Sequence, residues 1–171
     1  MRYINPLLFL FLVILGVKLS DSAYRWLAFG EERAQVKVLR SNLVDAGAQY
    51  VRTRQEGDSM RAVLRVEDEQ LEAEERRLRR YDSYASGGGL PPDVYERYRA
   101  DLTRYNRHVT ERNAKLADWQ EIQARHNAAA SRYTVLADSL NALATRMGDP
   151  YYAVPTPAEA AIERGVIKAQ P

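Results

Sequence analysis

The sequence contains no cysteine among its 171 residues. Disulfide bonds, thiol catalysis, cysteine-ligated metal sites and a lipid-anchored cysteine are therefore excluded. The absence is compatible with any cellular compartment, so it leaves the location of the protein open.

A strong excess of one charge sign is also missing. The chain has 25 Lys and Arg against 23 Asp and Glu, a formal net charge of +2. The arginines within residues 76–80 are interleaved with the glutamates of residues 72–75, which favours a solvated helix face over a phosphate-binding patch. We expect no nucleic acid partner.

Helix breakers are scarce in the first half of the chain. Residues 31–80 have no proline and only two glycines, Gly47 and Gly57. This predicts one long helix over residues 24–85. Gly57 is either a place where a partner helix comes close or a locally flexible point.

What the sequence does have is a long apolar stripe at helical spacing. Its members recur every three or four residues, the 3.5-residue average of a coiled-coil seam. They are Val36, Leu39, Leu43, Ala46, Tyr50, Thr53, Gly57, Met60, Leu64, Glu67, Leu71, Glu74, Leu78, Tyr81 and Ala85. A helix of this kind cannot bury its stripe alone, so it needs a partner.

The partner is a second stripe in the same chain. Residues 86–92 read Ser-Gly-Gly-Gly-Leu-Pro-Pro, where glycine ends one helix and proline begins the next. Such a short turn makes antiparallel neighbours, and its glycines form either a simple reversal or a docking loop. Gly148 followed by Pro150 then ends the second helix. The second stripe comprises Tyr98, Leu102, Tyr105, Val109, Arg112, Leu116, Trp119, Ile122, His126, Ala129, Tyr133, Leu136, Leu140, Leu143 and Met147.

The two stripes match when they are aligned as antiparallel neighbours. In such an alignment one residue number rises as the other falls, so the sum of the two paired numbers is constant. Leu39 then meets Leu140, and Gly57 meets Ile122, so that a small residue faces a large one. Other pairs on the same sum join polar with polar residues and sulfur with an aromatic ring. They include Leu43 with Leu136, Met60 with Trp119, Thr53 with His126, and Tyr81 with Tyr98. The sequence therefore predicts an antiparallel two-helix coiled coil over residues 24–147.

The polar members of the seam have structural interpretations. Glu67 and Arg112 fall opposite each other, and we expect a partly shielded ion pair that fixes the register. His126 opposite Thr53 could instead be a proton acceptor, a pH switch or a metal ligand, but it has no nearby ligand-type partner in the sequence. Trp119 is interpreted as seam packing rather than as a platform for a ligand.

Residues 1–23 form either a retained membrane anchor or a cleaved secretory signal. The anchor candidate consists of Leu7, Leu8, Phe9, Leu10, Phe11, Leu12, Val13, Ile14 and Leu15. We favour the anchor, because Ser20–Ser22 is a poor cleavage site and Tyr24, Trp26 and Phe29 resemble an interfacial aromatic belt. With Arg2 on the inside, the bulk of the chain would lie on the outer, periplasmic side of the cytoplasmic membrane as a single-pass protein.

Residues 148–171 form a proline-rich tail. Thr156, Pro157 and Glu159 predict a capping box and a short helix near 157–164. The tail either folds back on the base of the hairpin or binds a protein partner near the membrane. Its apolar candidates for that contact are Tyr151, Tyr152, Val154, Ile162, Val166 and Ile167.

The second arm carries a loose repeated pattern. Residues 104–109 read Arg-Tyr-Asn-Arg-His-Val, and residues 125–129 read Arg-His-Asn-Ala-Ala. This resembles the degenerate Tyr-Asn-Ala-Leu-Val helical repeat of bacterial envelope coiled coils, which implies a bacterial origin. The hairpin is also similar in shape to those of periplasmic adaptors of efflux and secretion systems, although the β-rich segments that flank such hairpins are missing here.

These patterns predict an all-α, non-catalytic protein without a cofactor or metal. We expect a membrane-tethered scaffold or accessory subunit of a larger energy-transducing, transport or envelope complex. The alternative is a periplasmic chaperone or adaptor that binds clients through the hairpin tip. Paired acids such as Glu74 and Glu75 are poor enzyme candidates, because a thin rod offers no cleft to bury them. A homodimer through a four-helix bundle stays open, although the polar seam positions favour a two-helix rod.

Overall fold

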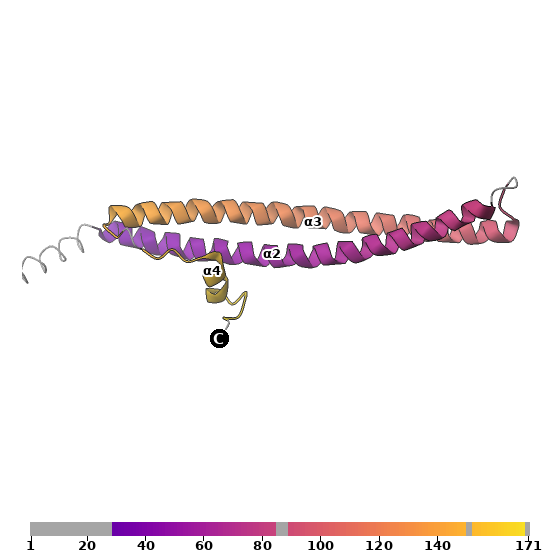
Figure 1. Ribbon diagram of the computed structural model, residues 1–171. Helices are drawn as coiled ribbons and strands as arrows, with labels where there is room; N and C mark the ends of the chain where they lie inside the picture. Colours follow the sequence, from indigo (N-terminus) through magenta and orange to yellow (C-terminus); the bar gives the residue numbers. More distant parts are fainter. Residues whose placement is uncertain (1–28, 85–88, 150–151, 170–171) are drawn as a thin grey trace, which may run out of the picture.

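The computed structural model describes residues 29–84, 89–149 and 152–169. Two long antiparallel helices, α2 (Gly30–Arg79) and α3 (Pro92–Arg146), lie side by side and form a narrow rod (Figure 1). At 1.5 Å per residue, the longer helix measures roughly 80 Å. No strand occurs in the described ranges. The predicted all-α hairpin is thus confirmed.

The seam follows the two predicted stripes. All of their described members are buried or half-buried, on both helices. The register is given by two contacts between helices: Thr53 Oγ1 lies 3.3 Å from His126 Nδ1, and the rings of Tyr81 and Tyr98 are 5.5 Å apart. Both pairs have the residue-number sum that the sequence predicts. The pairing therefore holds from the middle of the rod to its tip.

Gly57 packs against the partner helix. Its backbone is buried, and a Cβ atom built on it would lie 3.6 Å from Cγ2 of Ile122 and 2.7 Å from Nε2 of Gln123. The missing side chain leaves room for Ile122 in the seam. Of the two interpretations of this glycine, close packing is the one that the structure supports.

The helix ends follow the predicted signals. Pro92 opens α3, and Gly148 follows its end with φ of +79°, a conformation that glycine adopts without strain. The amide of Gly148 donates to the carbonyl of Thr145, and that of Asp149 donates to the carbonyl of Ala144, which is the Schellman arrangement. At the other end, α2 tightens into a 3₁₀ segment, η1 (Arg80–Tyr84), before the turn.

The buried core is concentrated toward the base of the rod, the end where α2 begins and α3 ends. There the chain adds a third element, α4 (Pro157–Glu163), which packs on α2 and projects from the rod (Figure 1). Toward the tip, the end near the turn, the buried apolar side chains among the described residues are Leu64 and Val94, and Ile122 is buried near the middle of the rod. The base core comprises Leu43, Val44, Ala46, Ala48, Ala129, Leu140, Leu143, Ala144, Ala160 and Ala161.

The predicted membrane segment lies outside the described residues, as do Tyr24 and Trp26 of the aromatic belt. Phe29 is described; it is half-buried and precedes the first residue of α2. None of the helices in the described part of the chain is long and apolar enough to span a bilayer.

Candidate interaction surfaces

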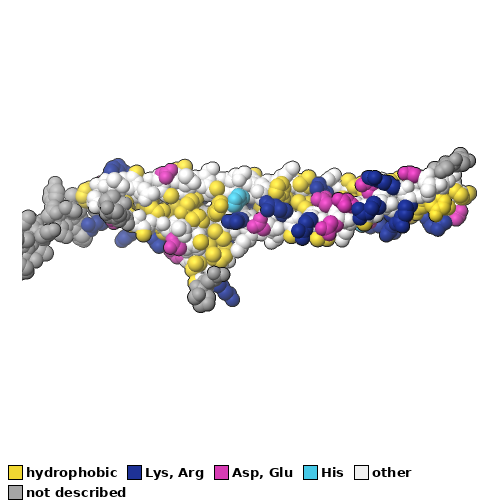
Figure 2. All heavy atoms as spheres, viewed as in Figure 1, with side chains coloured by type: hydrophobic (Ala, Val, Ile, Leu, Met, Phe, Trp, Pro, Cys, Tyr) yellow, Lys and Arg dark blue, Asp and Glu magenta, His cyan; other side chains and the backbone are white. Residues whose placement is uncertain are grey.

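The tail docks on a second face of α2, next to the seam. Small residues there admit α4 closely: a Cβ atom on Gly47 would lie 2.8 Å from the Cβ atom of Ala160 and 3.3 Å from Cα of Pro157. Ala160 and Ala161 are fully buried at this contact, together with Val44 of α2. Figure 2 shows hydrophobic side chains gathered where α4 meets the rod. This face has helical spacing of its own and is distinct from the coiled-coil stripe.

Polar contacts fix the tail in this position. The Arg40 guanidinium donates two hydrogen bonds to the Glu163 carboxylate, at 3.1 and 2.9 Å, and Arg164 pairs with Asp45 at 2.8 Å. The hydroxyl of Tyr133 on α3 donates to the carbonyl of Pro155 at 2.8 Å. The tail is thus bound to both helices of the hairpin.

The start of α4 is built as the sequence predicts. The Thr156 hydroxyl accepts a hydrogen bond from the Glu159 amide, and the Glu159 carboxylate accepts one from the Thr156 amide. The hydrogen bond from the Thr156 amide, and then one that the Thr156 hydroxyl donates to the same carboxylate, lower the pKa of Glu159. The hydrogen bond from Arg40, followed by the positive charges of Arg40 and Arg164, lowers the pKa of Glu163.

Most of the predicted partner-binding residues of the tail are partly covered in the folded chain. Tyr152, Val154, Val166 and Ile167 are half-buried, while Ile162 is exposed, with 40% of its surface accessible. Tyr151 lies outside the described residues. The tail therefore folds back, and it docks farther along the rod than the predicted position at the base.

A groove of about 270 Å³ is present at the base itself. It lies between the start of α2, the end of α3 and the beginning of the tail. Its walls are mainly apolar, and Val36, Met147 and Tyr152 contribute to them, with Lys37 and Asp149 also at its edge. This groove is at the end of the rod from which the chain leads back to residues 1–28.

The prediction that Glu67 and Arg112 form an ion pair is wrong, because each of them pairs with a different residue. Arg112 Nε donates to Asp68 Oδ1 at 2.8 Å, and Lys115 pairs with Glu67. Both long basic side chains extend past the position directly opposite them and reach a carboxylate displaced along α2. The two pairs still link the helices in the predicted register.

The other polar seam residues have contacts within the rod. His126 stacks on Tyr50, with ring centroids 4.6 Å apart, in addition to its contact with Thr53. Indole Nε1 of Trp119 is buried and has no hydrogen-bond partner among the residues that the structure describes. The described ranges contain no group of three or more His, Cys, Asp or Glu side chains that could hold a metal ion.

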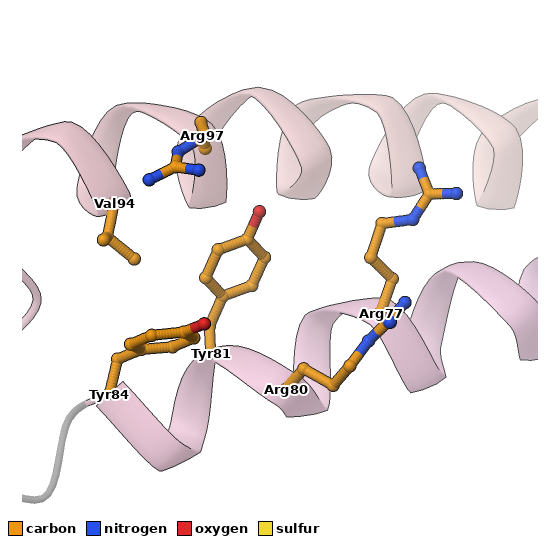
Figure 3. A pocket seen from close by; sticks show the side chains of 6 residues that line it. All are labelled: Arg77, Arg80, Tyr81, Tyr84, Val94 and Arg97. Atoms are coloured by element: carbon orange, nitrogen blue, oxygen red, sulfur yellow. The ribbon is translucent and has the colours of Figure 1, made fainter.

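At the tip, a pocket of about 310 Å³ opens between the end of α2, η1 and the first turns of α3 (Figure 3). Arg77, Arg80 and Arg97 line it together with Tyr81, Tyr84 and Val94. Arg77 and Arg80 were predicted to lie on a solvated face, and the pocket was not predicted. The signal was present in the spacing: Arg77, Arg80, Tyr81 and Tyr84 recur at helical intervals and so share one face.

Comparisons with protein-family models, with curated proteins and with solved structures found no match for this chain.

Proposed function

We propose that the protein is a membrane-tethered scaffold: a stiff helical hairpin that keeps two binding regions apart, one at the membrane and one at the tip. It would serve as an accessory subunit of a larger membrane-associated complex. The bulk of the chain would lie on the periplasmic side of the cytoplasmic membrane, with residues 1–23 as the anchor.

The observation that carries this proposal is the unbroken seam. Both stripes stay covered from one end of the rod to the other, and no proline interrupts either helix after its first turn. A rod of this kind spans roughly 80 Å with one fixed register, which suits a spacer. We infer a non-catalytic role, because the open grooves of such a rod would not exclude water from a reacting group.

The docked tail supports a structural role in a second way. It adds a third helix to the base half of the rod and ties both long helices together through Arg40 and Tyr133. This bracing stiffens the base half of the rod, whereas the thinner tip half lacks a third helix.

The membrane tether rests on the sequence of residues 1–30. The apolar run from Ile4 to Leu19 is shorter than the roughly 20 residues of a typical span, but the long side chain of Lys18 can reach the polar boundary of a bilayer. Tyr24, Trp26 and Phe29 follow and suit the same boundary. The base groove would then lie close to the membrane surface, where a membrane-embedded partner could reach it.

The test is to express the full chain and to extract its membranes with alkaline carbonate. The chain should stay with the membrane pellet, whereas a variant lacking residues 1–23 should be released. Intact mass measurement of the mature chain distinguishes a retained anchor from a cleaved signal. Native mass analysis in detergent should then find the chain within a larger particle, and recovery only as a free monomer would contradict the scaffold.

A further inference from the structure

The tip pocket combines an apolar floor with an exposed aromatic rim. Val94 of α3 is buried at the floor, and Tyr81 is half-buried beside it. Tyr84 stands at the edge with 58% of its surface exposed (Figure 3). A cavity of about 310 Å³ accommodates one or two side chains of a partner, since pockets for whole small molecules are commonly larger.

The arginines around this pocket differ from their neighbours in their pairing. Arg76 and Arg79, on the same helix, are bound to Glu72 and Glu75 through intrahelical ion pairs. Within the pocket, Arg97 is bound to its own helix through Asp93, at 2.9 Å.

Arg77 and Arg80 are the two without such a partner. Neither makes an ion pair or a side-chain hydrogen bond with any residue in the described ranges. Figure 3 shows the Arg77 side chain extending from α2 toward α3, on the other side of Tyr81 from Arg97. Two guanidinium groups are therefore free to bind an anion at the pocket.

Two of the acidic groups close to the pocket are already paired. Asp93 pairs with Arg97, and Asp101 accepts hydrogen bonds from the Tyr81 hydroxyl, at 2.8 Å, and from Arg104. The hydrogen bond to Asp101, with partial burial, raises the pKa of Tyr81, while the charges of Arg97 and Arg77 act in the opposite direction. The positively charged side chains of Arg97 and Arg77 thus lie on either side of Tyr81 (Figure 3).

We propose that the tip pocket binds an acidic segment of a partner protein. Arg77 and Arg80 hold a carboxylate of that segment, because the guanidinium fork matches the two oxygens of a carboxylate. Val94 and the ring of Tyr84 contact an apolar side chain next to it. Val94 and the tyrosine rings favour a peptide over a bare phosphate, which would leave these apolar surfaces without a contact.

This inference adds a recognition site to the proposed scaffold and does not depend on the membrane tether. The pocket is at the opposite end of the rod from the start of α2, the helix that follows residues 1–28 in the sequence (Figure 1). Failure of the membrane experiment would leave it intact, and failure of the binding experiment would leave the tether intact.

The experiment uses the full chain in detergent and a fluorescent synthetic peptide in which Glu and Leu alternate, followed by fluorescence anisotropy. The R77Q/R80Q variant should bind at least about tenfold more weakly, the loss expected for charge-assisted hydrogen bonds. R76Q/R79Q is the matched control: it removes the same charge from the same two turns of helix, and its binding should change less than about threefold. Circular dichroism verifies equal helicity, and R77K/R80K keeps the charge while it removes the guanidinium fork.

Several results would overturn the proposal. The first is that the full chain does not bind the peptide. The second is that R77Q/R80Q and R76Q/R79Q lose affinity equally. The third is that a peptide with Gln in place of Glu binds as tightly as the original. A site that takes inorganic phosphate or pyrophosphate but not the acidic peptide would assign the pocket to phosphate groups instead. If R77Q/R80Q lost helicity, equal binding by R77K/R80K and the unmodified chain would contradict recognition through the guanidinium fork, and a severalfold loss would support it.

Discussion

The hydroxyl of Thr53 on α2 lies 3.3 Å from Nδ1 of His126 on α3, and it also lies 3.0 Å from the carbonyl oxygen of Gln49 on its own helix. A hydroxyl has one hydrogen, and the backbone carbonyl accepts it. The Thr53 oxygen can at the same time accept a hydrogen bond from a His126 ring that carries its proton on Nδ1. This directional contact fixes the two helices in one register near the middle of the seam.

The two buried glycines of α2 should respond in opposite ways to the same substitution. Gly57→Ala places its Cβ atom 2.7 Å from the flexible end of Gln123, which can turn away, whereas Gly47→Ala meets Ala160 at 2.8 Å and the backbone of Pro157 at 3.3 Å. Alanine favours a helix over glycine by about 0.8–1 kcal/mol. We therefore expect Gly57→Ala to raise the melting temperature, and Gly47→Ala to release the tail.

Hydrogen exchange of the backbone amides measures this difference. In Gly47→Ala, the amides of residues 160–167 should exchange faster, while the seam amides of α2 and α3 keep their protection. Gly57→Ala is the control, and its tail should stay protected. Unchanged tail protection in Gly47→Ala would contradict the close packing of α4.

The docking of the tail should weaken in acid. The pKa of Glu163 is lowered in the folded chain, chiefly by the hydrogen bond from Arg40. A lowered pKa contributes stability above the unfolded value, about 4.3 for Glu, and this contribution is lost as the pH falls through the folded value. The pH window therefore lies below about 4.3.

Methyl NMR of Ala160 and Ala161 follows this change at the contact itself. On acidification from pH 6, their signals should move toward the undocked position as the pH falls through that window. Glu163→Gln should shift them already at pH 6, and its remaining acid dependence should come from Glu159, whose pKa is also lowered. Identical titrations of Glu163→Gln and the unmodified chain would show that this ion pair does not hold the tail.

Stability should be concentrated in the base half of the rod. Leu43 is fully buried there, whereas Leu71, at an equivalent seam position nearer the tip, is only half-buried. Leu43→Ala should lower the free energy of unfolding by about 2–5 kcal/mol, as for other buried leucines, and Leu71→Ala should lower it by about half as much. Urea unfolding followed by circular dichroism at 222 nm compares them, and an equal loss would refute a core located at the base.

The hairpin and its register could be predicted from the sequence because both depend on periodicity and on simple chain geometry. The stripes of residues 36–85 and 98–147 repeat over many turns, so single exceptions such as Thr53 do not obscure them. The capping box at Thr156 is also local, and local signals are readable without tertiary contacts.

The docking face and the exact ion pairs could not be predicted in the same way. The face around Gly47 is only a few turns long, and its small residues indicate close packing without indicating what packs there. Arg112 reaches Asp68 rather than Glu67, because a long flexible side chain selects among several acids within its reach. The tip pocket depends on which arginines find partners, and this is decided by side-chain directions that the sequence does not contain.

The central claim, a long intramolecular antiparallel rod, is tested most directly by electron paramagnetic resonance distances. The chain has no cysteine of its own, so spin labels attach only at introduced cysteines. Val38, Val135 and Tyr95 are suitable sites, because each is more than half exposed. Dilution with unlabelled chain restricts the signal to distances within one molecule.

With labels at Val38→Cys and Val135→Cys, the account predicts a distance of roughly 20 Å, set by the helix spacing and a short offset along the axis. With labels at Val38→Cys and Tyr95→Cys, it predicts roughly 70 Å, nearly the length of the rod. A first distance beyond about 50 Å would mean that the two helices do not fold back on each other, and it would contradict the hairpin on which the proposed functions depend.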